Sequence, residues 1–325
     1  MLTTPDTIRT LQRKLYRKAK QEPAYRFYAL YDKIHRADIL SHAYHRVRAN
    51  KGSAGIDGIA FEAIETGEGV TAFLAELQEA LKSKTYVPSP VKRVMIPKGD
   101  GTERPLGIPT IRDRVAQMAV KLVIEPIFEA DFIGTSYGFR PKKSAHDAIE
   151  DISHALYCGY AEVIDADVSK YFDTIPHAKL MAVVAERIVD SAILHIIQMW
   201  LKAPVMEMGK DGTKRNIGGG KANTKGTPQG GVISPLLANL YLHLLDRIWH
   251  RKQLQSKLGA RLVRYADDFV VLCRKGTEQP MAVVRRVLER LGLVLNENKT
   301  RVVDARKGSF DFLGFALCMR KSRRT

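Results

Sequence analysis

Two adjacent carboxylates, Asp267 and Asp268, are the first residues in the sequence whose type and spacing could do chemistry. They follow Tyr265 between two short apolar stretches, residues 261–264 and 269–274, which predict two strands joined by a tight turn. Like charges this close repel each other, and the turn contains no basic residue, so a divalent cation would supply the missing positive charge. The alternative is a solvated turn, because Asp is common in turns of any kind.

A third carboxylate, Asp167, ends another apolar stretch at residues 161–166. Taken alone, this Asp could equally cap the start of a helix. If the two strand ends are neighbours in one sheet, however, Asp167, Asp267 and Asp268 could form a cage of oxygen ligands. Such a cage suits two Mg²⁺ ions that activate a 3′-hydroxyl group and stabilise a leaving pyrophosphate.

The elements that must position these carboxylates are a mixture of strands and helices. A hairpin is predicted over residues 91–110, because Asp100-Gly101 between apolar runs is a strong turn signal. A long helix is predicted to begin at Ser234-Pro235, since Ser is a favourable N-cap and Pro a favourable first residue. Further helical patterns lie at 112–129, 144–157, much of 177–202, and 281–291.

Two other expectations concern the fold as a whole. Residues 209–227 are rich in Gly, Lys and Asn, which predicts a mobile loop. Strands that are mixed with helices along the chain predict an α+β fold, with helices on one face of a sheet.

The charge balance points to a polyanionic partner. The chain has 52 Lys and Arg against 35 Asp and Glu, a net charge of +17. Nucleic acid is the favoured partner, because each cation that neutralises a phosphate releases counterions. An anionic membrane surface and a merely basic soluble protein are the alternatives. The basic residues are dense near the N-terminus, at Arg9, Arg13, Lys14, Arg17, Lys18 and Lys20.

The cysteines and the hydropathy of the sequence indicate the cellular compartment in which the protein is expected. Cys158, Cys273 and Cys318 are odd in number and have no histidine at metal-ligand spacing, which favours a reducing environment without disulfides or structural zinc. The N-terminus has no apolar signal region, and no stretch has the length of a membrane-spanning helix. We therefore expect a cytoplasmic protein with no membrane partner.

Several segments occur in an order that is typical of one enzyme family. They are Asn50–Gly58, Ile96–Lys98 with Arg104–Arg114, Ser136–His146, Asp167–Phe172, Gly226–Asn239, Tyr265–Asp268, Leu295–Thr300 and Phe310–Phe315. Together they resemble reverse transcriptases, and the Gly226–Asn239 segment looks most like the group II intron-encoded reverse transcriptases (maturases). The resemblance covers roughly residues 45–318 of the chain.

This resemblance implies the fingers and palm of a right-hand polymerase, in which helices back an antiparallel palm sheet. The thumb is expected to be missing, because the sequence stops soon after the last palm segment. The expected division is a basic helical extension at 1–60, fingers at 61–160 that include the hairpin, a palm at 161–318 with a fingers-side insertion around 190–228, and a basic tail at 319–325.

The resemblance also implies roles for the carboxylates. Asp167, Asp267 and Asp268 would be the catalytic residues and would bind two Mg²⁺ ions, with help from the backbone carbonyl of Val168. Mn²⁺ could substitute for Mg²⁺. Lys299 would donate a proton to pyrophosphate, although a lysine at a strand edge needs no such role.

The remaining implied contacts are with nucleotide and nucleic acid. Lys98 and Arg104 would clamp the triphosphate across the hairpin, where the alternative is a solvated basic surface. Gln229 and Gly230 would contact the incoming nucleotide or the template, unless they are plain turn residues. Phe172 would lie beneath the sugar, unless it is simply a core aromatic. Contacts with nucleic acid are expected from Arg13, Lys14, Arg17, Lys18, Arg112, Arg114 and Arg140.

The function implied is that of an RNA-directed DNA polymerase of the group II intron type, which also binds intron RNA as a maturase. Its partners would be an RNA template, intron RNA, a DNA primer and deoxynucleoside triphosphates, with a homodimer as one option. A retron or CRISPR-associated reverse transcriptase is one alternative. An RNA-binding splicing cofactor with secondary polymerase activity is another.

Overall fold

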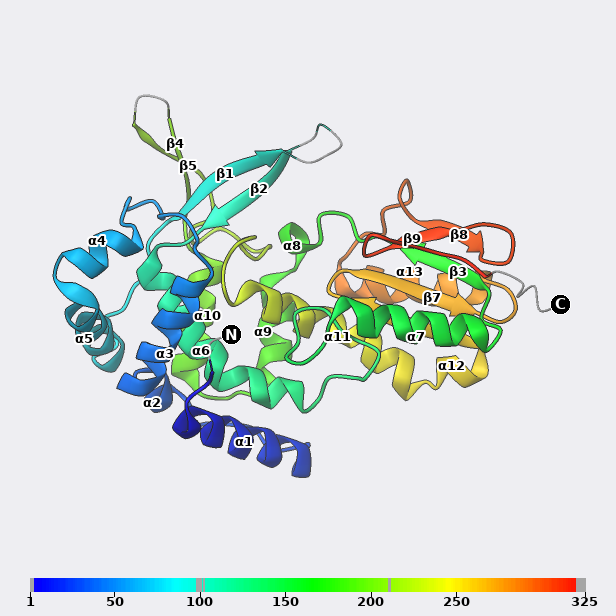
Figure 1. The fold of residues 1–325 in the computed structure, drawn as a ribbon, viewed down its shortest axis with the longest axis horizontal. Helices are drawn as coiled ribbons and strands as arrows, with labels where there is room; N and C mark the ends of the chain where they lie inside the picture. Colours follow the sequence, from blue (N-terminus) through cyan, green and yellow to red (C-terminus); the bar gives the residue numbers. More distant parts are fainter. Residues whose placement is uncertain (1–2, 98–100, 102, 210–211, 320–325) are drawn as a thin grey trace. The chain divides into compact units, whose positions relative to one another are not determined.

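The computed structural model describes residues 3–97, 101, 103–209 and 212–319. It consists of two compact units, each built from two segments of the chain (Figure 1). Unit 1 contains Met1–Asp131 and Pro176–Leu237, and unit 2 contains Phe132–Ile175 and Ala238–Thr325. None of the helices in the described residues combines the length and the apolar character that a bilayer-spanning helix requires.

Unit 1 is mainly helical. Its helices are α1 (Asp6–Gln21), α2 (Tyr31–Ile34), α3 (Ala37–Ala49), α4 (Phe61–Thr66), α5 (Gly69–Lys82), α6 (Ile111–Glu129), α9 (His177–Ala185) and α10 (Ser191–Leu201). Helix α6 is central, because nearly every position from Val115 to Ile124 is buried and both α1 and α3 pack against it. Thr110 is the N-cap of this helix, and its side chain accepts a hydrogen bond from the backbone N–H of Asp113.

Unit 1 also contains a four-stranded sheet in the order β2-β1-β4-β5. The strands are β1 (Val91–Pro97), β2 (Glu103–Ile108), β4 (Val205–Met208) and β5 (Lys214–Gly218). The predicted hairpin is confirmed as the antiparallel pair β1–β2. The prediction of a loop over 209–227 is wrong where β5 pairs with β4. Every residue of β5 is exposed, so no alternation of apolar and polar residues marks it as a strand.

Unit 2 is built on an antiparallel sheet in the order β6-β7-β3-β8, which confirms the expected α+β fold with an antiparallel palm sheet. The strands are β3 (Glu162–Ala166), β6 (Ala260–Tyr265), β7 (Asp268–Cys273) and β8 (Arg301–Asp304), and a small hairpin follows with β9 (Phe310–Phe312) and β10 (Phe315–Leu317). The helices are α7 (Ala145–Tyr157), α8 (Tyr171–Thr174), α12 (Leu254–Lys257) and α13 (Glu278–Leu291). Helix α11 (Ser234–Arg251) begins in the last residues of unit 1 and continues into unit 2.

Helices cover both faces of the unit 2 sheet, so the expectation of one covered face is wrong. On one face, Val163 and Val270 pack with residues of α7 in a single buried cluster. On the opposite face, Arg264 of β6, the residue after Val263 of that cluster, donates a hydrogen bond to Asp246 of α11 at 3.0 Å. The alternation of side chains along each strand supplies apolar residues to both sides.

The division into units can be compared with the expected one. Residues 132–160 were expected in the fingers but lie with the unit 2 sheet, because α7 packs on β6 and Asp151 of α7 forms an ion pair with Arg261 of β6 at 2.5 Å. Residues 176–237 belong to unit 1, where β4 pairs in parallel with β1. This segment contains the fingers-side insertion that was expected around 190–228.

The carboxylate of Asp190 accepts hydrogen bonds at the starts of two helices of unit 1. Oxygen Oδ2 of Asp190 accepts hydrogen bonds from the backbone N–H groups of Leu30 and Tyr31, at 2.8 and 2.9 Å. Oxygen Oδ1 caps α10 by accepting from Ala192 and Ile193, at 3.1 and 3.2 Å. A single buried side chain therefore satisfies the first N–H groups of both α2 and α10.

We predict that Asp190→Ala lowers the free energy of unfolding by about 1–4 kcal/mol, because each lost N-cap costs about 0.5–2 kcal/mol. Denaturation in urea would measure the change. Glu68→Ala is the matched control, since Glu68 stands at the N-cap of α5 without making a side-chain cap hydrogen bond. Equal destabilisation by the two substitutions would contradict the role assigned to Asp190.

Candidate active site

The structure brings the three predicted carboxylates to one end of the unit 2 sheet. Strand β3 pairs antiparallel with β7, and Ala166 lies opposite Phe269. One position further along this register, Asp167 stands opposite Asp268. Asp267 belongs to the two-residue turn that joins β6 to β7, where Tyr265 pairs with Asp268. The end of β3 and the turn between β6 and β7 therefore meet at the same end of the sheet, as the sequence suggested.

These carboxylates influence one another electrostatically. The pKa of Asp268 is raised to about 6, first by desolvation of its carboxyl group and then by the negative charges of Asp267 and Asp167. Asp165 raises this pKa further, whereas the positive charge of Lys299 lowers it. Asp268 is nevertheless exposed at the surface, so a charged ligand could reach it. Desolvation and neighbouring negative charge therefore both disfavour the ionised form of Asp268.

The donor chemistry of the cluster fits a hard divalent cation, because carboxylate oxygens are the ligands that Mg²⁺ and Mn²⁺ prefer. Over the described part of the chain, no three His, Cys, Asp or Glu side chains are gathered closely enough to hold a metal ion as they stand. The carboxylates are thus near enough to repel one another without already surrounding a common point. A cation would relieve that repulsion by drawing them together.

Asp167 is held in place by a segment that follows α13. The side-chain amide of Asn296 donates to Oδ2 of Asp167 at 2.8 Å, and the backbone N–H of Asn296 donates to the Asp167 carbonyl at 2.8 Å. The next residue, Val168, forms an antiparallel bridge with Leu295. Lys299 is exposed in the same segment. Asn296 had no predicted role, although it lies in one of the segments that resemble the family.

The turn that carries Asp267 has a constrained backbone. Ala266 has a φ of 58°, in the left-handed region that residues other than Gly adopt only when their surroundings hold them there. Gly138 lies directly against this turn, since a Cβ at that position would collide with the backbone nitrogen of Ala266. The one sequence signal for this contact is a Gly inside the Ser136–His146 segment.

Phe172 lies in the short helix α8 and is 7% exposed. Its ring packs edge-on against Tyr171, with ring centroids 5.7 Å apart. The hydroxyl of Tyr171 in turn donates to the carbonyl of Ala238 at 2.6 Å, which fixes α8 to α11. A buried ring five positions after Asp167 is compatible with both interpretations, so contact with a sugar stays a prediction.

Two of the predicted nucleotide-binding residues meet within unit 1. The Nε of Arg104 donates to Oε1 of Gln229 at 2.8 Å. The Gln229 carbonyl accepts a hydrogen bond from Gly107 of β2 at 2.5 Å. Gly230 has a φ of 110°, and a Cβ there would lie 2.5 Å from the Gly107 carbonyl, so the turn requires Gly. Lys98, the other predicted triphosphate ligand, lies outside the described residues.

Four of the basic residues expected to contact nucleic acid lie on α1, and they differ in exposure. Arg13, Lys14 and Arg17 are exposed. Lys18 is half-buried; its Nζ lies 2.6 Å from the carboxylate of Glu22 and 4.3 Å from the centre of the Tyr25 ring. Only the first three therefore present uncommitted charge to solvent.

Arg114 and Arg140 are buried. Arg114 is 6% exposed and donates to the carbonyl of Ser53 at 2.6 Å, which argues against the predicted contact with nucleic acid. Arg140, for which a structural role was the alternative to a contact with the template backbone, is 9% exposed and donates to the carbonyls of Ile133 and Ser136, at 2.7 and 2.5 Å. Arg112 is intermediate, since it is half-buried over the ring of Tyr86 at 5.0 Å.

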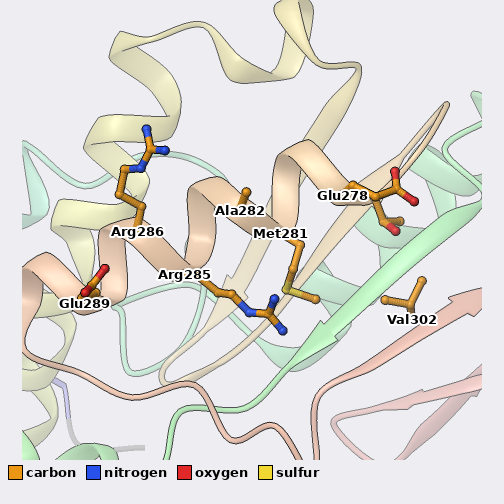
Figure 2. Close-up of a pocket in the computed structure, with 8 residues that line it drawn as sticks. Glu278, Met281, Ala282, Arg285, Arg286, Glu289 and Val302 are labelled. Atoms are coloured by element: carbon orange, nitrogen blue, oxygen red, sulfur yellow. The ribbon is translucent and has the colours of Figure 1, made fainter.

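A groove of about 580 Å³ lies elsewhere on unit 2, along α13 and beside β8 (Figure 2). Figure 2 shows Met281 and Arg285 on the side of α13 that faces Val302, with Arg286 on the other side. The lining mixes both signs of charge, and Arg285 is paired with Glu297 at 2.8 Å. None of its lining residues belongs to the carboxylate cluster.

Comparison with known proteins gives a consistent picture. The family model described as reverse transcriptase (RNA-dependent DNA polymerase) matches residues 96–317. The chain is 35% identical to protein YkfC of Escherichia coli, over 97% of this chain and 90% of that protein. It is 30% identical to the group II intron-encoded protein LtrA of Lactococcus lactis subsp. cremoris, over 91% of this chain.

The chain spans only 57% of the length of LtrA. Among solved structures, telomerase from Candida albicans in complex with a fragment of telomeric RNA gives a TM-score of 0.53, at 16% identity over 75% of this chain and 50% of that one. At this identity the likeness shows the fold alone. The family match covers more than half of the chain and includes all three carboxylates: the chain belongs to the reverse transcriptase (RNA-dependent DNA polymerase) family.

Proposed function

We propose that this chain is an RNA-directed DNA polymerase that adds deoxynucleotides to the 3′-hydroxyl of a primer on an RNA template. The observation that carries the proposal is the meeting of Asp167, Asp267 and Asp268 at one end of an antiparallel sheet, in a member of the reverse transcriptase family. Primer extension on an RNA template with Mg²⁺ is the direct test.

In this proposal the three carboxylates, with the backbone carbonyl of Val168, hold two Mg²⁺ ions. When bound, such ions offset the charge of the attacking and leaving oxygens. The raised pKa of Asp268 is consistent with the assignment, because its causes, desolvation first and then the charges of Asp267 and Asp167, are ones that a bound cation would offset. Asn296 orients the Asp167 carboxylate through its hydrogen bond, and Lys299, whose charge acts on Asp268, would protonate the departing pyrophosphate.

The triphosphate and the template are assigned to unit 1. Arg104 offers a planar donor fork that suits phosphate oxygens, and its hydrogen bond to Gln229 would orient both side chains toward one ligand. The close backbone packing of Gly230 on Gly107 fixes the turn that presents Gln229. These roles follow from the family resemblance and are supported by the contact between the two residues.

We also propose that the chain binds the RNA of a group II intron, as a maturase does. The similarity to LtrA, described as a group II intron-encoded protein, supports this proposal, as does the net charge of +17. The outer face of α1 contributes exposed cations at Arg13, Lys14 and Arg17. Backbone phosphates of a structured RNA are suited to such a face.

Asp267→Asn or Asp268→Asn is expected to lower the rate of nucleotide incorporation by about 10²- to 10³-fold, which corresponds to about 3–4 kcal/mol of lost transition-state stabilisation. RNA binding and thermal stability should be retained, because both side chains lie at a surface turn. Asp311→Asn removes an exposed carboxylate from β9, outside the proposed ligand set, and serves as the control. Near-normal extension by either turn variant would overturn the proposed ligand set.

RNA binding is expected to depend steeply on salt and to draw on α1. Replacing Arg13, Lys14 and Arg17 with Gln should flatten the slope of log affinity against log salt by up to about 2–3, at about 0.7–0.9 per phosphate contact. The measurement is a filter-binding titration at several salt concentrations.

The matched control removes the same charge from exposed residues of unit 2, at Arg251, Lys252 and Lys257. This variant should change the slope much less than the α1 variant. An equal effect of the two variants would show that net charge, and not the α1 face, sets the salt dependence.

Phe172→Val is expected to admit ribonucleotides. A bulky ring beneath the sugar leaves a 2′-hydroxyl without space or partner, so the ratio of kcat/KM for a ribonucleotide and its deoxy counterpart should rise roughly 10- to 100-fold. Phe310→Val is the control, because Phe310 is a similarly buried aromatic in the core cluster beneath α7. An unchanged ratio in Phe172→Val would make Phe172 a core residue only.

A further inference from the structure

Behind the turn that carries the carboxylates lies a fully buried arginine, Arg264 of β6, which is 0% exposed. Its Nε and Nη2 donate to both carboxylate oxygens of Asp246 on α11, at distances between 2.5 and 3.1 Å. Its remaining terminal nitrogen, Nη1, donates to Oδ1 of Asn239 at 2.9 Å and to the backbone carbonyl of Ala266 at 2.7 Å. The guanidinium thus connects α11 to the turn that contains Asp267.

Burial alone would raise the pKa of Asp246, but the charge of Arg264 and hydrogen bonds from His243 and Arg264 outweigh it and lower the pKa to about 2. Asp246 is therefore ionised, and it neutralises the arginine within the core. A buried ion pair of this kind is often no more stabilising than an apolar pair of similar volume. The arginine, however, also donates a hydrogen bond to the Ala266 carbonyl, which an apolar side chain could not do.

The other side of the turn is fixed by Gly138. The side-chain amide of Asn239 donates to the Gly138 carbonyl at 2.5 Å, while its oxygen accepts from Arg264. The segment that contains Gly138 also pairs with the backbone of Arg264, through hydrogen bonds with Thr135 and Tyr137 at 2.9 and 2.8 Å. One connected set of hydrogen bonds therefore holds the Ala266 carbonyl directly and also holds Gly138, which packs against the Ala266 nitrogen.

We propose that Arg264, oriented by Asp246 and Asn239, is a positioning residue that fixes the peptide after Ala266 and so sets where the Asp267 and Asp268 carboxylates lie. The inference rests on the proposed role of those carboxylates as cation ligands. It goes beyond that role because it assigns their geometry to groups that touch neither cation nor nucleotide. The left-handed φ of Ala266 is the conformation that these hydrogen bonds maintain.

Arginine suits this position because its planar fork can serve a carboxylate and two further acceptors at once. Lysine would keep the charge and the pairing with Asp246, but a single ammonium group cannot also reach Asn239 and the Ala266 carbonyl. Arg264→Lys should therefore loosen the turn without leaving a buried charge unpaired. A small displacement of catalytic groups lowers rates by up to about 100-fold.

The experiment compares Arg264→Lys with Arg261→Lys in the full chain. Arg261 lies on the same strand and its Nε and Nη2 donate to Asp151 at 2.9 and 2.5 Å, but it makes no contact with the turn. For Arg264→Lys we expect kcat to fall about 10- to 100-fold, with little change in KM for the nucleotide. The Mg²⁺ concentration for half-maximal rate should rise, and Mn²⁺ binding, measured by calorimetry without substrate, should weaken. Arg261→Lys should change none of these.

A purely structural role would give a different result. Activity would then fall only in proportion to the folded fraction, and the dependence on Mg²⁺ and the affinity for Mn²⁺ would stay as in the wild type, which would overturn the inference. Asp267→Asn separates the two proposals. If it leaves Mn²⁺ binding unchanged, the cation-ligand assignment fails; if it abolishes binding while Arg264→Lys does not weaken it, only the positioning role fails.

If Arg264→Lys does not fold, Gly138→Ala tests the same set of contacts from the other side. The added Cβ would push against the backbone nitrogen of Ala266, whereas Gly134→Ala places its Cβ in open space four residues earlier. Gly138→Ala should show the lowered kcat and the weakened Mn²⁺ binding, and Gly134→Ala should not. The same cation affinity in both variants would overturn the inference.

Discussion

Repulsion among the carboxylates at one end of the unit 2 sheet is the constraint that the rest of that unit must withstand. Asp167, Asp267 and Asp268 repel one another when they are ionised, so holding them close requires a source of free energy. The source is the surrounding sheet, in which Val163, Val270 and their neighbours are fully buried beneath α7 and continue the pairing up to the last residue before the cluster. Apolar burial thereby fixes charged groups in an arrangement that only a cation would make favourable.

The buried arginine behind the carboxylate turn is neutralised by a neighbouring carboxylate. Arg264 faces Asp246 in the core, and their charges cancel locally. The turn in front of them receives a hydrogen bond from the guanidinium without gaining a net positive charge that would compete with a bound cation. Asn239 then extends the set to Gly138, so that a helix, a strand and an edge segment all converge on the backbone of Ala266.

In unit 1, single buried acidic side chains anchor the starts of helices. Asp190 accepts four backbone hydrogen bonds and joins the starts of two helices that are far apart in the sequence. Asp113 accepts from the hydroxyl of Tyr86 at 2.6 Å and from that of Thr110 at 2.7 Å, and so anchors the start of the central helix α6. Exposed cations such as Arg104 and Arg17 lie on the surface of the same unit, where the phosphates of a polyanionic ligand can reach them.

The sequence by itself determined the features that depend on neighbouring residues. The hairpin at 91–108, the start of α11 at Ser234 and the two acidic strand ends could be predicted, because turn residues, helix caps and short apolar runs act locally. Tertiary structure alone decided which charged residues face inward. Arg114 and Arg264 look like surface cations in the sequence, yet each is buried against a carbonyl or a carboxylate that another segment of the chain supplies. The same holds for the hydrogen bond of Asn296 to Asp167 and for the exposed strand β5. A buried charge is tolerated only where the fold delivers its partners, and no local pattern records where those partners come from.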